Sequence, residues 1–226
     1  KGRANSIAVL PFANLSGDPA QAYFSDGIAE ELRNALSRAG LTVVARTSSE
    51  MVRNADAKTA ARQLDVAHIV SGSVRRSPSM IRVNAQLVDG GDGLERWSDS
   101  FDRPAGDLLA IQTSIAENVA QALSVELAGD DRNVVTLGGT GNPAAQDLYL
   151  RTTPGGPGDS EAGLNHYLGL LNAAIALDPN FAQAHARKAF ILTLIAGIYA
   201  LSAAEAQAGY QQALASANRA IAIAPR

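Results

Sequence analysis

The hydrophobic pattern in the first part of the chain alternates between short apolar runs and helical spacing. Residues 7–10 are apolar at every position and precede Pro11, which predicts a short strand buried on both faces. Apolar side chains then recur every four residues, at Phe24, Ile28, Leu32 and Leu36. This spacing predicts a helix with one apolar stripe that ends at Gly40. A second strand is expected over residues 41–45, with short helices after it.

Further along the chain the period changes from four to two. Residues 69–74 lead to a turn, and residues 81–88 alternate apolar with polar side chains, which predicts a strand with one buried face. The turn residues 89–93 separate it from another predicted strand, residues 95–101. A long amphipathic helix is predicted from apolar residues at Leu108, Ile111, Ile115, Val119 and Leu123. The order of elements predicts an α/β fold, a mixed sheet with flanking helices.

The second part of the chain shows no strand pattern. Alanine becomes dense, helical spacing dominates, and the Pro- and Gly-rich residues 152–159 are expected to form an exposed loop. We therefore divide the chain into an α/β domain at residues 1–130, a linker at residues 131–143 and an all-α helical repeat region at residues 144–226. The stretch AAIALDP, which ends at Pro179, is echoed by RAIAIAP, which ends at Pro225.

Composition narrows the classes of function. The chain has 226 residues, 46% of them hydrophobic, with 19 basic and 22 acidic side chains. This balance argues against a nucleic-acid binder and against a polybasic contact with membrane lipids. The absence of cysteine excludes thiol nucleophiles and thiolate metal sites.

The loop after the first strand invites comparison with phosphate-binding loops. Residues 14–24 contain a single glycine, Gly17, and no lysine, so they fit neither a Walker loop nor a dinucleotide fingerprint. We expect Ser25 or Asp26 to cap the following helix instead, and we expect residues 14–23 to contact a partner.

No catalytic, cofactor or metal site is predicted. The three histidines are far apart in sequence and lack the spacing of a helical metal pair. Adjacent carboxylates such as Glu30 and Glu31 point in different directions on a helix, so they cannot share a proton. The chain is therefore expected not to be an enzyme. A hydrolase or transferase acting in a cleft between the domains remains an alternative, as does a dimerisation spacer.

The stretches SIAVLPFANLSGDPAQAYFSDGIAEELRNALSR and VSGSVRRSPSMIRVNAQLVDGGDGLERWSDSFDR resemble the TolB amino-terminal-like domain over residues 6–127. The helical part resembles tetratricopeptide repeats, in which small residues line the contact between two helices and a proline ends the second. It departs from them because Pro179 and Pro225 lie further apart than the repeat length of about 34 residues. His185 also stands where a bulky aromatic is usual.

The resemblance implies a regulatory and protein-interaction segment of a bacterial multidomain signalling protein. Its implied effector is an upstream class III nucleotide cyclase, adenylate or guanylate, or a CadC-like winged-helix transcriptional regulator. It also implies a membrane tether elsewhere in the protein and favours a periplasmic location, with the cytoplasm as the alternative. The expected partner is a protein or peptide, a homodimer stays open, and the segment itself is expected to touch neither nucleic acid nor membrane.

Two groups of residues are candidates for binding a partner. Tetratricopeptide repeats bind peptides on a concave face, and the resemblance places four residues towards that face, namely Gln183, Arg187, Phe190 and Thr193. Arg75 and Arg76 lie at the end of a predicted hairpin near Arg82, where guanidinium groups could grip a phosphate or an acidic peptide. The alternatives are contact with a neighbouring helix for the first group and a solvated hairpin tip for the second.

Overall fold

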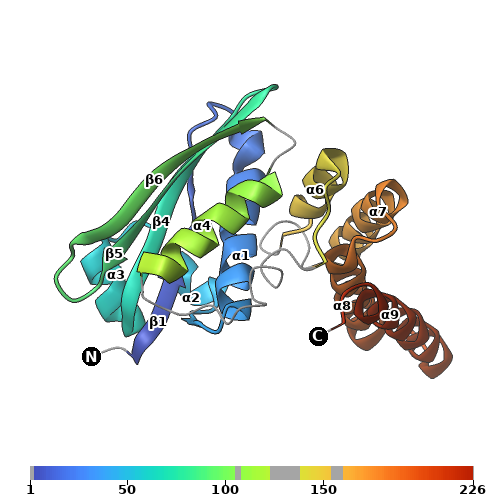
Figure 1. The fold of residues 1–226 in the computed structure, drawn as a ribbon. Coiled ribbons are helices and arrows are strands. Elements are labelled where there is room, and N and C mark those ends of the chain that lie inside the picture. The colour runs from blue at the N-terminus through green and yellow to red at the C-terminus, as the bar shows by residue number, and fades with distance from the viewer. Residues whose placement is uncertain (1–2, 105–107, 123–137, 154–159, 226) are drawn as a thin grey trace. The chain divides into compact units, whose positions relative to one another are not determined.

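The computed structural model describes residues 3–104, 108–122, 138–153 and 160–225. The chain divides into two compact units, Lys1–Thr136 and Leu137–Arg226. We describe each unit by itself (Figure 1).

The first unit is built on a mixed β-sheet. Its strands are β1 (Arg3–Val9), β2 (Ala13–Asn14), β3 (Thr42–Val43), β4 (Val66–Arg76), β5 (Met80–Asp89) and β6 (Glu95–Pro104). They follow the order β3-β1-β4-β5-β6, with β2 also paired to β4. β1 runs parallel to β3 and β4, whereas β4, β5 and β6 are antiparallel neighbours. The predicted mixed sheet is confirmed.

Helices flank the sheet on both faces. The helices of this unit are α1 (Ala22–Arg38), α2 (Arg46–Met51), α3 (Ala57–Leu64) and α4 (Leu108–Ala122), with a short 3-10 turn at Pro19–Gln21. Figure 1 shows α1 and α4 side by side in front of the sheet and α3 behind it. Behind the sheet, Ala8 of β1 and Ile69 of β4 share a core cluster with Ala60 and Ala61 of α3. This cluster covers only the β1 and β4 part of that face.

The predicted apolar stripe of α1 is confirmed, because all four of its residues are buried. The predicted cap of this helix is wrong. Ser25 and Asp26 lie inside α1, which begins at Ala22. The chain turns earlier, at Pro19, and the Asp18 carboxylate there accepts a hydrogen bond from the Ala20 amide at 2.9 Å.

The second unit contains only helices among its described residues. These are α6 (Pro143–Leu150), α7 (Glu161–Leu177), α8 (Ala182–Ile198) and α9 (Ala203–Ile223). Each packs against the next along the chain. The rings of Tyr149 and Phe181, both buried, lie 4.9 Å apart and join α6 to the start of α8. Leu171 and Ala174 bury the inner side of α7.

The expected linker at residues 131–143 differs from the structure where it is described. Thr140 is buried and its hydroxyl donates to the Asp178 carboxylate. The Gly138 carbonyl accepts a hydrogen bond from the Gln183 amide at 3.0 Å, and Pro143 already belongs to α6. Residues 138–143 are therefore packed into the helical unit by hydrogen bonds that span about 40 positions of sequence, which a local composition of glycines does not reveal. Residues 131–137 lie outside the described residues.

Candidate functional site

The register of β4, β5 and β6 places polar side chains in rows on one face of the sheet. Two rows cross all three strands, Ser71–Gln86–Ser98 and Ser73–Asn84–Ser100. On β5 the intervening residues Ile81, Val83, Ala85 and Leu87 are buried on the other face. Because side chains alternate along a strand, burying one set towards α1 and α4 leaves the amides and hydroxyls on the opposite face.

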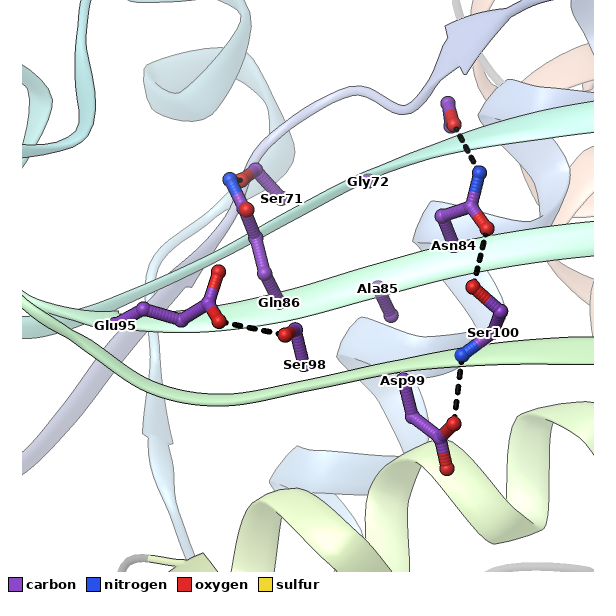
Figure 2. Close-up of a pocket in the computed structure, with 10 residues that line it drawn as sticks. Ser71, Gly72, Asn84, Ala85, Gln86, Glu95, Ser98, Asp99 and Ser100 are labelled. Atoms are coloured by element: carbon purple, nitrogen blue, oxygen red, sulfur yellow. Dashed lines mark hydrogen bonds between the residues drawn. The ribbon is translucent and has the colours of Figure 1, made fainter.

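Hydrogen bonds between strands fix these side chains. The Gln86 Nε2 group donates to Ser71 Oγ at 2.9 Å, and the Asn84 Nδ2 group donates to Ser73 Oγ at 3.1 Å. The Ser100 hydroxyl donates in turn to Asn84 Oδ1 at 2.7 Å (Figure 2). A serine hydroxyl that accepts one bond keeps its own hydrogen for another acceptor. The rows are therefore ordered and still able to bond a ligand.

These rows line an open hollow of roughly 630 Å³. Its ten lining residues are Ser71, Gly72, Ser73, Asn84, Ala85, Gln86, Glu95, Ser98, Asp99 and Ser100. The volume suits a small ligand, although known ligand pockets are mostly apolar. The set contains no histidine, lysine or cysteine. It pairs a hydroxyl with a carboxylate where Ser98 Oγ donates to Glu95 Oε1 at 2.5 Å, on an exposed stretch of β6 (Figure 2). Its chemistry is that of a hydrogen-bonding surface.

Ion pairs stand at both ends of this face. Arg82 bonds both carboxylate oxygens of Asp102, at 2.6 and 2.8 Å, and this hydrogen bonding lowers the pKa of Asp102. At the other end Arg96 reaches Asp89 at 3.0 Å and Asp92 at 2.7 Å. The pKa of Asp89 is lowered, first by Arg96 and then by the backbone amide of Gly91.

A second polar cluster ties α1 to α2 on the other side of the unit. Arg53 bridges Glu50 at 2.7 Å and Asp26 at 3.5 Å. Burial raises the pKa of Asp26, although Arg53 opposes that shift. The buried Arg33 pairs with Glu30 and donates to the Val9 carbonyl at 3.0 Å, while burial lowers its pKa. The Arg53 contacts join α1 to α2, and the Arg33 contacts join α1 to β1, so both have a structural role.

The two arginines predicted at the hairpin end point in opposite directions. Arg76 donates to the Tyr23 hydroxyl at 3.0 Å and lies 4.4 Å from the centre of the Phe24 ring, so it packs β4 against α1. Arg75 is exposed and stands opposite Arg82 on β5. The structure therefore does not bring Arg75 and Arg76 together, and binding of a partner by either stays a prediction.

The four candidates on α8 also differ in their contacts. Arg187 lies 3.8 Å from the centre of the Tyr149 ring and donates to the Tyr149 carbonyl at 3.2 Å. The Thr193 hydroxyl bonds back to the Ala189 carbonyl within the same helix. Gln183 is partly buried, and Phe190 is 58% exposed. Their role in binding a partner stays a prediction, best suited to Phe190 because its ring is open to solvent.

The polar rows were missed in the sequence because serine, asparagine and glutamine form no catalytic or metal motif. The alternation over residues 81–88 did carry a usable signal. Had the polar positions of that strand been aligned with the two neighbouring strands, the rows would have emerged.

Within the parts of the chain that the structure describes, no helix combines the length and apolar character needed to cross a membrane. In the same residues, no three acidic or histidine side chains gather as a metal ion would require.

Comparison with known proteins gives one relative by sequence at significant similarity. The chain is 36% identical over 189 residues to "Putative adenylate cyclase 3" of Rhizobium meliloti, a match that takes in 82% of this chain. The chain spans about a third of the length of that relative, 32%. No family model matches.

Comparison with solved structures gives weaker similarities. TolB from Acinetobacter baumannii aligns with a TM-score of 0.41 and 18% identity, over 54% of this chain and 29% of its own. A PelC dodecamer from Paraburkholderia phytofirmans aligns with a TM-score of 0.38 and 19% identity, over 54% and 89%. At these TM-scores the likenesses carry no argument about what the chain does.

Proposed function

We propose that this chain is the non-catalytic regulatory and protein-interaction part of a bacterial signalling protein whose catalytic part is a nucleotide cyclase. The observation that carries the proposal is the 36% identity over 189 residues to a relative named as an adenylate cyclase. Because the match takes in about a third of that relative, a separate catalytic part has room elsewhere in a protein of this kind. This relative favours a cyclase over a winged-helix regulator as the effector.

The surfaces of the chain support binding as its mode of action. The hollow over β4, β5 and β6 offers ordered amides and hydroxyls, and its lining contains no histidine, lysine or cysteine. A ligand that binds one conformational state better than another shifts the balance between them, and a fused effector would register that shift. The mechanism we propose is a partner engaging one of the two units and biasing the cyclase.

For the helical unit we propose the tetratricopeptide arrangement. Its helices pack in sequence order, α6 with α7 and α8 with α9, as helical hairpins do. The buried Ala174 lies where two helices meet, and α7 ends just before Pro179. Phe190 then offers an exposed ring on the first helix of the second hairpin.

The proposal is tested by assaying two proteins side by side with ATP and GTP in the presence of Mg²⁺ or Mn²⁺. The 226-residue chain alone is expected to form no cyclic nucleotide, whereas the protein made from its full reading frame is expected to form it. Turnover by the 226-residue chain would overturn the non-catalytic assignment. A full reading frame without cyclase activity would overturn the choice of effector.

A periplasmic placement of the segment remains part of the proposal. Protease added to intact spheroplasts is expected to degrade the segment. Degradation only after lysis would favour the cytoplasm instead.

A further inference from the structure

Strand β6 forms one edge of the sheet. A hydrogen bond between β5 and the residue just before β6 shows which way the backbone groups point. The Asp89 amide donates to the Leu94 carbonyl at 2.9 Å, so the odd-numbered residues of β5 face β6. Their partners on β6, such as Phe101 opposite Val83, are also odd-numbered. The register shifts by one residue between Leu87 and Val88, which is why Leu94, before the shift, faces β5 although it is even-numbered. Beyond the shift, the even-numbered residues 98–104 therefore direct their backbone polar groups away from the sheet.

Two of these outward groups are covered by neighbouring side chains of the same strand. The Ser100 amide donates to Asp99 Oδ1 at 2.7 Å, and the Asp102 carbonyl accepts from Arg103 Nη1 at 2.9 Å. All four residues are exposed. Among the described strands none pairs with this side of β6, which is ten residues long. Long unpaired edges readily pair with another chain.

We propose that β6 pairs antiparallel with β6 of a second copy of this chain, about a two-fold axis at Phe101. In this register Ser100 faces the partner's Asp102 as a hydrogen-bonded pair. The Ser100 amide then donates to the partner's Asp102 carbonyl. These are the two groups that neighbouring side chains cover in the single copy. Two-fold symmetry repeats the pair on the other side of the axis.

In the paired form Asp99 no longer covers the Ser100 amide, and Arg103 no longer covers the Asp102 carbonyl. These two side chains are complementary in charge. Asp99 comes directly opposite the partner's Arg103, and symmetry again makes two such pairs. Each Asp99 carboxylate therefore gains an ion-pair partner across the axis, and so does each Arg103 guanidinium. Opposite charges at directly opposed positions stabilise antiparallel pairing, and like charges weaken it.

The neighbouring registers that keep outward groups facing each other are less suitable. A two-fold axis at Asp99, or one at Asp102, sets that carboxylate against its own copy. An axis at Ser100 sets Asp99 against the partner's Phe101, an apolar side chain. Pro104 has no amide hydrogen, so in the favoured register the pairing weakens at both ends, where Pro104 of one copy faces Ser98 of the other.

The pairing would also extend the polar face described above. Ser100 lines the hollow at the edge of the sheet, and in the paired form the partner's Asp102 lies beside it. The hollow of each copy would therefore border acidic and hydroxyl groups of the other. This inference concerns the assembly of the chain and does not depend on the cyclase assignment.

Sedimentation equilibrium of the 226-residue chain over a range of concentrations tests the pairing. We expect a monomer–dimer equilibrium, and Asp99→Arg or Arg103→Asp should each weaken it about tenfold or more by creating two like-charge pairs. The double variant Asp99→Arg with Arg103→Asp should restore it. Arg62→Asp, an equal charge change on the exposed side of α3, is the matched control and should leave it unchanged. A chain that stays monomeric, or reversals that change nothing, would overturn the proposal.

Engineered disulfides test the register, since the chain has no cysteine of its own. Directly opposed residues of this type have Cα atoms about 4.5 Å apart, within reach of a disulfide. The variant Asp99→Cys with Arg103→Cys should form a covalent dimer under mild oxidation. Within one strand these positions are about 13 Å apart and cannot join. Cross-linking by Asp99→Cys alone, or by Ser100→Cys alone, would show a different register and refute the one proposed.

Discussion

Replacing Gly72 with alanine tests the packing beneath the polar face. Gly72 lies on β4 opposite Ala85 of β5. A Cβ added there would stand 2.3 Å from the Asn84 carbonyl oxygen and 2.8 Å from the ring of Phe12, which is fully buried. The oxygen belongs to the backbone and cannot rotate away. The substitution should therefore push β5 away from β4.

The expected loss in the free energy of unfolding follows from these contacts. Overfilling a packed core costs about 1–3 kcal/mol, and a clash with backbone belongs at the upper end. A loss of about 3 kcal/mol in the free energy of unfolding corresponds to a melting temperature lower by roughly 10 °C for a unit of this size. The displacement of β5 should also break the register of the polar rows on β4 and β5.

The single tryptophan, Trp97, makes the assay specific. It lies in β6 with its ring 6.2 Å from that of Phe101, so its fluorescence follows unfolding of the first unit. Gly169→Ala is the control, because Gly169 is exposed in α7 with nothing within 4 Å of an added Cβ. It should leave the tryptophan transition in place and stabilise the helix by about 0.5–1 kcal/mol. A midpoint for Gly72→Ala within about 2 °C of the wild type would show that the sheet accommodates the added methyl group, contrary to this prediction.

Two further predictions concern charged residues. Since burial raises the pKa of Asp26, the stability tied to that carboxyl is present below its unfolded pKa and is lost as pH rises through its folded pKa. Asp26→Asn should therefore gain stability over the wild type in urea melts as pH rises from about 3 to 7, and a loss at neutral pH would show that the pair with Arg53 prevails. Arg187→Ala removes a cation–π contact with Tyr149 and hydrogen bonds, and should destabilise the helical unit by about 2 kcal/mol in circular dichroism melts. Phe190→Ala, at an exposed ring, should change it by less than about 0.5 kcal/mol, and equal losses for both would contradict the assignment.

Periodic patterns were enough to predict most elements of the first unit. The four-residue spacing of α1 and the alternation of β5 repeat over many positions, so the buried face follows from sequence. The two-residue strand β2 has no period to detect. The start of α1 was missed because the chain commits to a helical turn at Pro19, and that turn sets where the helix can begin.

The roles of the candidate residues depend on contacts between helices and strands, and local sequence does not encode these contacts. Arg187 looked free to bind a partner, but the fold places the Tyr149 ring beneath it from another helix. Arg76 is likewise held by Tyr23 of α1. The serine and amide rows arise only when three strands pair in register, and their members are unremarkable one at a time.

We propose that this chain acts on a catalytic part through its surfaces. The most direct measurement is the rate of cyclic nucleotide formation by the full-length protein with and without residues 1–226. We predict that the shortened protein keeps measurable turnover at saturating ATP but at a rate changed several-fold, because the bias imposed by this segment is gone. Identical rates for the two proteins would contradict the claim.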